Sequence, residues 1–247
     1  MTVHFIGAGP GAADLLTLRA VHLLQSSAVC LYAGTYLDAQ VLAHCPEGAD
    51  LVDTRRMTLD EITERLVAAD RAGHDVARLC SGDPSVYSAI AEQTRRLDAA
   101  GVAWDVTPGV PAYAATAALV GRELTVPEVA QSVVLTRAHQ DSTTMPPGEQ
   151  LAAFAATGAT LVLHLAIRHT RRLAEELTAY YGADCPVVVG SRVSQPEELV
   201  LRGTLADIAD QVQAHGLTQA AVILVGRALA AEDFVESHLY SCARTGR

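Results

Sequence analysis

Three short turns hold most of the residues whose types and spacing could bind a ligand. Residues 7–12 read GAGPGA, residues 81–84 read SGDP, and residues 107–111 read TPGVP. Each turn follows an apolar segment with the pattern of a strand and precedes a helical pattern. Ligands of open parallel sheets bind beyond the carboxyl ends of the strands, so three aligned turns predict a binding site at one sheet edge.

The first turn formally satisfies the G-x-G-x-x-G/A fingerprint of dinucleotide-binding proteins. Two features oppose that interpretation. Pro10 lacks the backbone N–H that such a loop would donate to a pyrophosphate. The next apolar strand continues as Ala33-Gly34-Thr35, without an acidic residue for the ribose hydroxyls. An NAD-dependent oxidoreductase is therefore an alternative that depends on this turn alone.

The second turn allows two interpretations. Gly82 lets a ligand approach the backbone closely, and Asp83 could accept hydrogen bonds from ligand hydroxyls or attract a cation. Alternatively, Asp83 caps the helix that follows, and Gly-Asp-Pro is an ordinary turn between a strand and a helix. Three such turns in alignment favour a binding site.

The basic residues restrict the chemistry. All 18 are arginine, so the chain has no lysine for a Schiff base, for pyridoxal chemistry or for a Walker phosphate loop. The formal net charge of −10 disfavours nucleic acid as a partner, because nucleic-acid binding is driven by neutralising phosphates. An anionic ligand would have to be met by local arginines.

Metal and acyl-transfer chemistry find little support. His164 and His169 are five residues apart across a strand end and do not share a helical face as a zinc pair would. The chain lacks a Gly-x-Ser-x-Gly elbow. The five cysteines have no C-x-x-C spacing, which predicts reduced, mostly buried thiols and no protein-bound metal. They are Cys30, Cys45, Cys80, Cys185 and Cys242.

The location of the protein is predicted from two further observations. No apolar segment approaches the roughly 20 residues that a membrane-spanning helix needs. The chain opens directly on a strand and a glycine turn, which is not the pattern of a signal peptide. We therefore expect a cytoplasmic protein.

Strand and helix patterns alternate in the first half, which predicts a parallel, doubly wound sheet. Thr58 and Glu61 form a capping box that opens a helix. Charge and Pro127 interrupt the alternation, and we place a domain boundary there, giving two α/β domains at 1–122 and 130–247. The second has the pattern of a mixed sheet. The predicted strands are 3–6, 28–32, 76–80, 102–106, 132–136, 160–165, 187–189, 198–201 and 221–225, and the predicted helices include 14–25, 58–71, 168–181 and 204–215.

Taken together, the turns resemble those of the tetrapyrrole methylases, which use S-adenosylmethionine. The opening motif of that family is similar to residues 7–17, its Gly-Asp-Pro motif to 81–86 and its Pro-Gly-Val turn to 108–110. The resemblance spans nearly the whole chain. It implies two α/β domains with the methyl donor in the cleft between them, a tetrapyrrole substrate and a homodimer. Further segments that carry it are 31–34, 81–87, 123–129, 135–137 and 202–205.

Site residues follow from the resemblance position by position. The implied binding residues for S-adenosylmethionine are Pro10, Ser81, Gly82, Asp83, Val86, Pro111, Ala112, Leu165, Val193 and Ala221. Because tetrapyrrole substrates carry many carboxylates, arginines and tyrosines near the cleft are candidates to bind the substrate. These are Arg55, Tyr87, Tyr113, Arg122 and Arg137.

The chemistry needs few catalytic side chains. A sulfonium already carries a strong leaving group, so alignment of the donor with an electron-rich ring carbon could supply much of the catalysis. No general base is assigned. Two alternatives of other classes stay open, the NAD-dependent oxidoreductase and a non-catalytic corrinoid carrier. Within the family, the identity of the tetrapyrrole and whether it carries cobalt also stay open.

Overall fold

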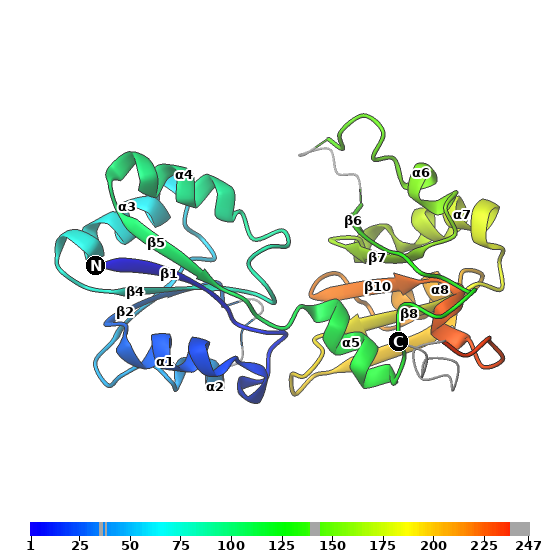
Figure 1. Ribbon diagram of the computed structural model, residues 1–247, viewed down its shortest axis with the longest axis horizontal. Coiled ribbons are helices and arrows are strands. Elements are labelled where there is room, and N and C mark those ends of the chain that lie inside the picture. Colours follow the sequence, from blue (N-terminus) through cyan, green and yellow to red (C-terminus); the bar gives the residue numbers. More distant parts are fainter. Residues whose placement is uncertain (35–36, 38, 139–143, 238–247) are drawn as a thin grey trace, which may run out of the picture. The chain divides into compact units, whose positions relative to one another are not determined.

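The computed structural model describes residues 1–34, 37, 39–138 and 144–237. The chain forms two compact units (Figure 1). Unit 1 comprises Met1–Ala115 and Arg192–Glu198, and unit 2 comprises Thr116–Ser191 and the chain from Leu199 onward. The predicted domain ranges, 1–122 and 130–247, stay a prediction. The prediction divides the chain at one place, whereas in the structure residues 192–198 of the second half pack with unit 1.

Sheet 1, in unit 1, has five parallel strands in the order β3-β2-β4-β1-β5. The predicted parallel sheet is therefore confirmed. The sequence patterns did not predict β3, because its two apolar residues stand between aspartates at a sheet edge and give no clear alternation. The strands are β1 (Thr2–Gly7), β2 (Val29–Tyr32), β3 (Asp50–Asp53), β4 (Val76–Cys80) and β5 (Ala103–Thr107).

Helices cover both faces of sheet 1, as a doubly wound sheet requires (Figure 1). Ile6, Ala77 and Leu79 pack against α1 and α2, whereas Val3 and Phe5 pack against α3 and α4. The capping box is confirmed: Thr58 N–H donates to Glu61 at 2.6 Å, and Glu61 N–H donates to the Thr58 hydroxyl at 3.3 Å. The helices are α1 (Leu18–Ser26), α2 (Ala39–Leu42), α3 (Leu59–Arg71) and α4 (Ile90–Ala100).

Three of the predicted helices begin later than expected: the helix from residue 14, the helix whose apolar pattern includes Val86, Ile90 and Leu97, and the helix from residue 204, which begins at Ile208. The helix predicted from residue 14 is a short 3-10 turn, Ala13–Leu15, followed by α1, which starts where the Thr17 hydroxyl accepts from Ala20 N–H at 3.1 Å. Helix α4 begins at Ile90, so Val86 lies in the preceding turn. A left-handed residue, Ala89, separates the two and explains the late start.

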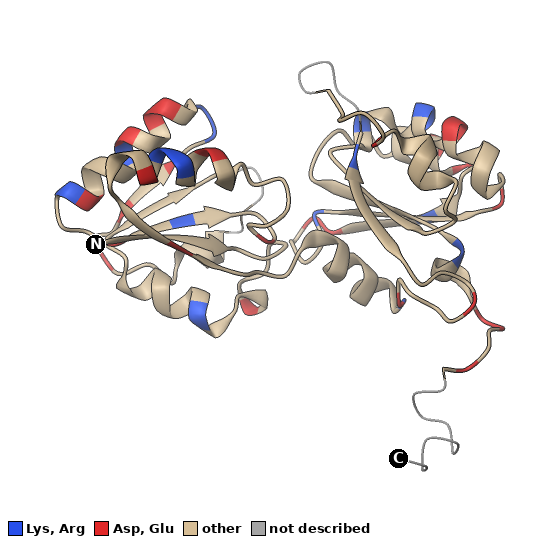
Figure 2. Cartoon of the chain, turned by 45° about the horizontal axis from the view of Figure 1, so that its top comes forward, with Lys and Arg blue, Asp and Glu red and all other residues tan. Residues whose placement is uncertain are grey.

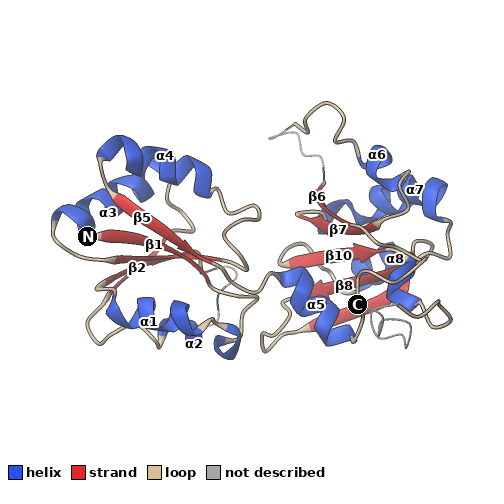
Figure 3. Cartoon of the chain, in the orientation of Figure 1, coloured by secondary structure: helices blue, strands red, loops and turns tan. Residues whose placement is uncertain are grey.

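Sheet 2, in unit 2, is mixed, as predicted. Its order is β6-β7-β10-β8-β9; β6 and β7 are parallel and the other pairs are antiparallel. Figure 3 shows the strands flanked by helices in each unit. Buried residues of α6, α7 and α8 form one core with alternate residues of the strands. The strands are β6 (Val133–Arg137), β7 (Thr160–His164), β8 (Pro186–Ser191), β9 (Leu199–Thr204) and β10 (Ala221–Val225). The helices are α5 (Ala112–Val120), α6 (Leu151–Ala155), α7 (Thr170–Tyr181) and α8 (Ile208–Ala214), with short 3-10 turns at Ile167–His169 and Arg227–Ala230.

Charged residues lie mainly on helices and loops in both units (Figure 2). In the part of the chain that the structure describes, no helix has the length and apolar character to cross a membrane. Cys30, Cys80 and Cys185 are buried free thiols, and Cys45 is partly exposed. Cys242 lies outside the described residues.

Candidate functional site

The three predicted turns meet at the carboxyl ends of β1, β4 and β5. Gly9 and Gly82 form an antiparallel bridge, with N–H···O distances of 3.2 and 2.8 Å. Gly109 lies against both Gly7 and Gly82. We call this contact of Gly7, Gly9, Gly82 and Gly109 the glycine junction. The loops after the neighbouring strands β1 and β4 lead to helices on opposite faces of the sheet, which is where doubly wound sheets bind ligands.

Glycine is required at the junction because main chain packs directly on main chain. A Cβ at Gly7 would lie 2.4 Å from the nitrogen of Gly109. A Cβ at Gly109 would lie 2.3 Å from the carbonyl oxygen of Gly82. Gly82 itself has a φ of 66°, a conformation that glycine adopts without strain, and a Cβ there would contact Pro111 Cα at 3.5 Å. The junction therefore brings Gly82 next to Pro111. Both residues are predicted to bind S-adenosylmethionine.

Asp83 ties two of the turns together. Its Oδ2 accepts from Gly109 N–H at 2.8 Å, and its Oδ1 accepts from Ser85 N–H at 2.8 Å and from the Ser85 hydroxyl. Partial burial raises the pKa of the Asp83 carboxyl, but these hydrogen bonds outweigh burial and hold the pKa below its ordinary value. The ionised carboxylate thus braces the junction. Asp83 does not cap the following helix, because α4 begins only at Ile90 and its N-cap is Ala89. The carboxylate instead holds the turn through Ser85 and Gly109, and contact with a ligand stays a prediction.

The first turn offers few N–H groups to a ligand. Ala8 N–H donates to Cys80 O at 2.8 Å, Gly9 N–H to Gly82 O, and Ala12 N–H to the Ser194 hydroxyl at 3.0 Å. Pro10 has no N–H. A dinucleotide clamp needs several of these groups pointing at the pyrophosphate. The hydrogen bonding of this turn therefore opposes the NAD interpretation.

A segment distant in sequence also packs on the first turn. Residues 192–198, which join β8 to β9, belong to unit 1. Gln195 Nε2 donates to Pro10 O at 3.0 Å, beside the bond between Ser194 and Ala12. Val193, which is predicted to bind S-adenosylmethionine, is buried in this segment. Pro10 and Val193 are therefore brought close together, although they are far apart in the sequence.

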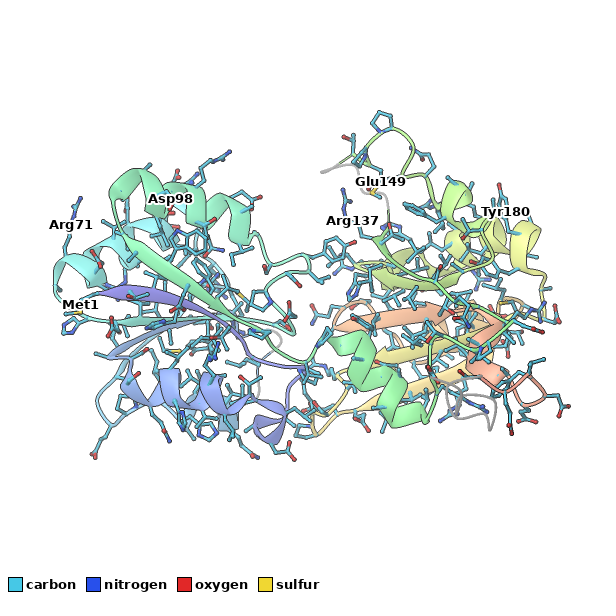
Figure 4. All side chains as sticks on the ribbon, viewed as in Figure 1. Met1, Arg71, Asp98, Arg137, Glu149 and Tyr180 are labelled. Atoms are coloured by element: carbon cyan, nitrogen blue, oxygen red, sulfur yellow. The ribbon has the colours of Figure 1, made fainter. Side chains whose placement is uncertain are left out.

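Three predicted residues of unit 2 lie at one end of sheet 2. Leu165 directly follows β7, and Ala221 opens the antiparallel neighbour β10. Arg137 ends β6, opposite His164 in the register with β7 (Figure 4). Leu165 is 52% exposed. This end of sheet 2 therefore collects the predicted residues of unit 2 except Arg122.

The remaining candidates are more scattered. Arg122 lies after α5, where it donates to Ala231 O at 3.2 Å and faces Glu232 at 3.9 Å. Arg137 donates to the carbonyls of Ala138 and Thr144, both at 3.2 Å. Tyr87 is exposed in the turn before α4. The others lie at turns of unit 1: partly exposed Val86 and Ala112, exposed Ser81, and partly exposed Tyr113 in the first turn of α5.

Arg55 belongs to a second cluster, formed by the end of β3, the middle of β4 and α4. Its Nε donates to Asp53 at 2.7 Å. Next to it, Arg78 is buried, with its Nε 2.9 Å from Gln93 Oε1 and its Nη1 3.4 Å from the Thr54 hydroxyl. We call these five residues the arginine corner. Among the described residues, Arg78 has no carboxylate partner, which is unusual for a buried guanidinium.

The sequence patterns missed Arg78 and Gln93 as members of this cluster. Burial lowers the pKa of Arg78, and burial raises the pKa of the neighbouring Cys80 thiol to about 11. That thiol is therefore neutral near pH 7 and does not compensate the guanidinium. A charged residue in the middle of the buried strand VARLC was the available signal, since such a strand is otherwise apolar.

Left-handed backbone marks several of the same places. Among the residues that the structure describes, seven besides glycine have positive φ, and four of them are Tyr87 (53°), Leu165 (52°), Arg192 (47°) and Ser194 (67°). The first two are predicted site residues, and the other two flank Val193. Such conformations cost about 1–3 kcal/mol each and concentrate at functional sites. They support the predicted positions independently of the residue types.

Comparison with known proteins agrees with this geometry. The model of the tetrapyrrole (corrin/porphyrin) methylases matches residues 2–209. The chain belongs to this family. A precorrin-4 C(11)-methyltransferase from Rhodococcus erythropolis is 59% identical over 244 residues, which cover 99% of this chain and 98% of the relative. The resemblance seen in the three turns is therefore confirmed.

Solved structures of the methylase family share both sheets. A cobalt precorrin-4 methyltransferase superimposes with a TM-score of 0.90 at 35% identity, covering 93% of this chain and 96% of the other. A uroporphyrin-III C-methyltransferase from Thermus thermophilus, complexed with S-adenosylhomocysteine, superimposes with a TM-score of 0.77 at 29% identity, covering 93% and 99%. The predicted fold class is confirmed: the chain is α/β, with one parallel sheet and one mixed sheet.

Proposed function

We propose that this chain is an S-adenosylmethionine-dependent C-methyltransferase that methylates precorrin-4 at C11, giving precorrin-5 in cobalamin biosynthesis. The observation that carries the proposal is the 59% identity, over nearly the full length of both chains, to a precorrin-4 C(11)-methyltransferase. The segments 31–34, 81–87, 123–129, 135–137 and 202–205 resemble precorrin-4 C11-methyltransferases, and 123–129 is the most specific of them. The Thermus relative with bound S-adenosylhomocysteine supports the choice of methyl donor.

The glycine junction suits a donor held mainly by main chain. In unit 1 the proposed contacts are Pro10, Ser81, Gly82, Asp83, Val86, Pro111, Ala112 and Val193. The junction fixes its turns through contacts that leave no room for a Cβ, so a ligand resting on it meets a wall of fixed shape. Leu165 and Ala221 of unit 2 are proposed contacts as well. Alignment of the methyl group with the attacking carbon would then supply much of the rate.

Arginines are proposed to bind the carboxylates of the substrate. Arg55 is 56% exposed beside Asp53, and its guanidinium retains further N–H groups for a carboxylate. Arg137, Tyr87 and Tyr113 are proposed with it. Arg122 is a weaker candidate for substrate binding than these residues, because its guanidinium already contacts Ala231 O and Glu232. We also propose a cytoplasmic protein without a protein-bound metal, as the sequence patterns predict, and a homodimer, as the family resemblance implies.

A second candidate substrate is cobalt-precorrin-4. The observation that favours it is the TM-score of 0.90 to a cobalt precorrin-4 methyltransferase. The higher identity to the relative named for precorrin-4 places this candidate second. The two substrates differ in the metal of the ring, and their turnover can be compared directly.

The decisive experiment incubates the purified protein with labelled S-adenosylmethionine and, in parallel, precorrin-4, cobalt-precorrin-4 or uroporphyrinogen III. We expect one labelled methyl group on precorrin-4, assigned to C11 by NMR, with faster turnover than on the other substrates. Faster methylation of another substrate would reassign the enzyme within the family. Binding of corrinoid without methyl transfer would instead support a carrier, and thermal stabilisation by NAD alone would support an oxidoreductase.

A further inference from the structure

The connection between β8 and β9 makes two hydrogen bonds to the glycine-rich first turn. Ala12 N–H donates to the Ser194 hydroxyl at 3.0 Å, and Gln195 Nε2 donates to Pro10 O at 3.0 Å. We call residues 192–198 the strap. Its contacts join positions 182 and 185 residues apart in the chain. The strap therefore packs on a turn that lies far from it in the sequence.

The strap and the first turn also fit each other sterically. A Cβ at Gly11 would lie 2.3 Å from Gln195 Cγ and 2.8 Å from Gln195 Nε2. Gly11 therefore leaves the space that the Gln195 side chain fills. This pairing and a φ of 156°, which strains any residue with a side chain, give reasons for glycine at position 11 that have nothing to do with phosphate binding. In a double-mutant cycle the backbone strain is common to both backgrounds and cancels.

The strap is held in one conformation by its own hydrogen bonds. Ser194 N–H donates to Glu198 at 2.6 Å, and Gln195 N–H donates to Arg192 O at 2.9 Å. Arg192 and Ser194 both have left-handed backbone. The strap therefore holds the Ser194 and Gln195 side chains on a fixed backbone. Its two left-handed residues cost conformational strain that a simple connection between two strands does not require.

We propose that Gln195 and Ser194 are positioning residues for the methyl donor. They fix Pro10 on the turn and Val193 on the strap, two proposed donor contacts, in one arrangement before the donor arrives. Ser194 also occupies the N–H of Ala12, which removes a donor that a phosphate-bearing cofactor would use. The inference rests on the proposed function, because it assigns these side chains to the affinity for the donor.

The test measures S-adenosylhomocysteine binding by calorimetry and methyl-transfer kinetics for Gln195→Ala and Ser194→Ala. We expect Gln195→Ala to weaken binding about tenfold, equivalent to ~1.4 kcal/mol. The KM for S-adenosylmethionine should rise while kcat at saturating donor stays within about twofold, because the lost interaction serves binding rather than the reaction itself. The matched control is Gln211→Ala in unit 2, whose Nε2 also donates to a main-chain carbonyl, that of Arg202, at 3.2 Å.

Two further variants keep the inference falsifiable if alanine unfolds the strap. Gln195→Glu preserves size but places a carboxylate against Pro10 O, and we expect weaker binding than wild type with an unchanged melting temperature. In a double-mutant cycle, Gly11→Ala should weaken binding less in the Gln195→Ala background than in wild type, because the side chain that it displaces is already gone. Wild-type affinity in both Gln195 variants, or additive effects in the cycle, would overturn the inference. Failure of the wild type to bind S-adenosylhomocysteine would overturn the proposed function as well.

Discussion

Sheet 1 holds two clusters built on opposite principles. In the glycine junction, the ends of β1, β4 and β5 meet through main chain, and Cβ atoms are excluded. In the arginine corner, polar side chains from the end of β3, the middle of β4 and α4 make the contacts. Sterics therefore fix the first cluster, whereas the second holds two guanidinium groups, Arg55 exposed beside Asp53 and Arg78 buried.

The two clusters also differ in how they bear charge. Asp83 in the junction has both carboxylate oxygens satisfied by N–H and hydroxyl donors. Arg78 in the corner is buried among neutral acceptors, Gln93 and Thr54. A buried charge with neutral partners depends heavily on each hydrogen bond that remains. Substitutions in the junction should therefore destabilise the fold through steric clashes. Substitutions in the corner should destabilise it by leaving a buried charge without hydrogen-bond partners.

The largest effect is expected from Gly109→Ala. The new Cβ would lie 2.3 Å from Gly82 O and 2.8 Å from Gly7 Cα, and neither atom can move without displacing a strand end. We expect the free energy of unfolding to fall by about 4 kcal/mol or more, in the range reserved for severe packing defects. Urea denaturation measures it.

The control for this variant is Gly101→Ala. Gly101 has a φ of 70° with nothing within 4 Å of a Cβ, so alanine there costs only backbone strain, about 1 kcal/mol. Gly109 itself has no left-handed backbone, so equal losses for the two variants would show that close packing does not explain glycine at this position.

Sequence reasoning found the junction more readily than the corner, for a physical reason. Gly82 and Pro108 carry local turn signals that fix where strands end, and parallel strands bring such turns to one edge. Arg78 carries no local signal beyond its charge within a buried strand, and Gln93 lies on a helix that gives no indication of its partner. The strap was missed for the same reason, because contacts between residues so far apart leave no periodic pattern in the sequence.

An intermediate effect is expected in the corner, from Gln93→Leu. The variant leaves Arg78 Nε buried without its acceptor, which should cost about 2–3 kcal/mol of unfolding free energy. Arg78→Met in the same background should recover part of the loss, because a buried charge is then replaced by an apolar side chain. Both are measured by urea denaturation.

Gln213→Leu provides the comparison for Gln93→Leu. Gln213 is exposed and accepts from Arg171 at 3.0 Å, so its loss should change stability by less than about 0.5 kcal/mol. If Gln93→Leu were equally mild, Arg78 would have to be hydrated or compensated elsewhere, and the contrast between the corner and the junction would disappear.

The smallest effect is expected from Asp83→Asn, and it should depend on pH. An amide offers one acceptor oxygen where the carboxylate uses two, so the variant should lose about 1–2 kcal/mol near pH 7. Because the pKa of folded Asp83 lies below the ordinary value of about 3.9, its ionised form stabilises the fold above that value. This contribution is lost as the pH falls through the pKa of the folded state.

The stability difference between wild type and Asp83→Asn should therefore be constant from pH 7 to about 5 and shrink below about 4. Unfolding free energies measured from pH 3 to 7 give this curve, and Glu47→Gln, at an exposed carboxylate, supplies the baseline. A difference that stays constant to pH 3 would mean that the brace does not need the charge. The junction would then be held by glycine packing alone, with Asp83 free to serve the ligand instead.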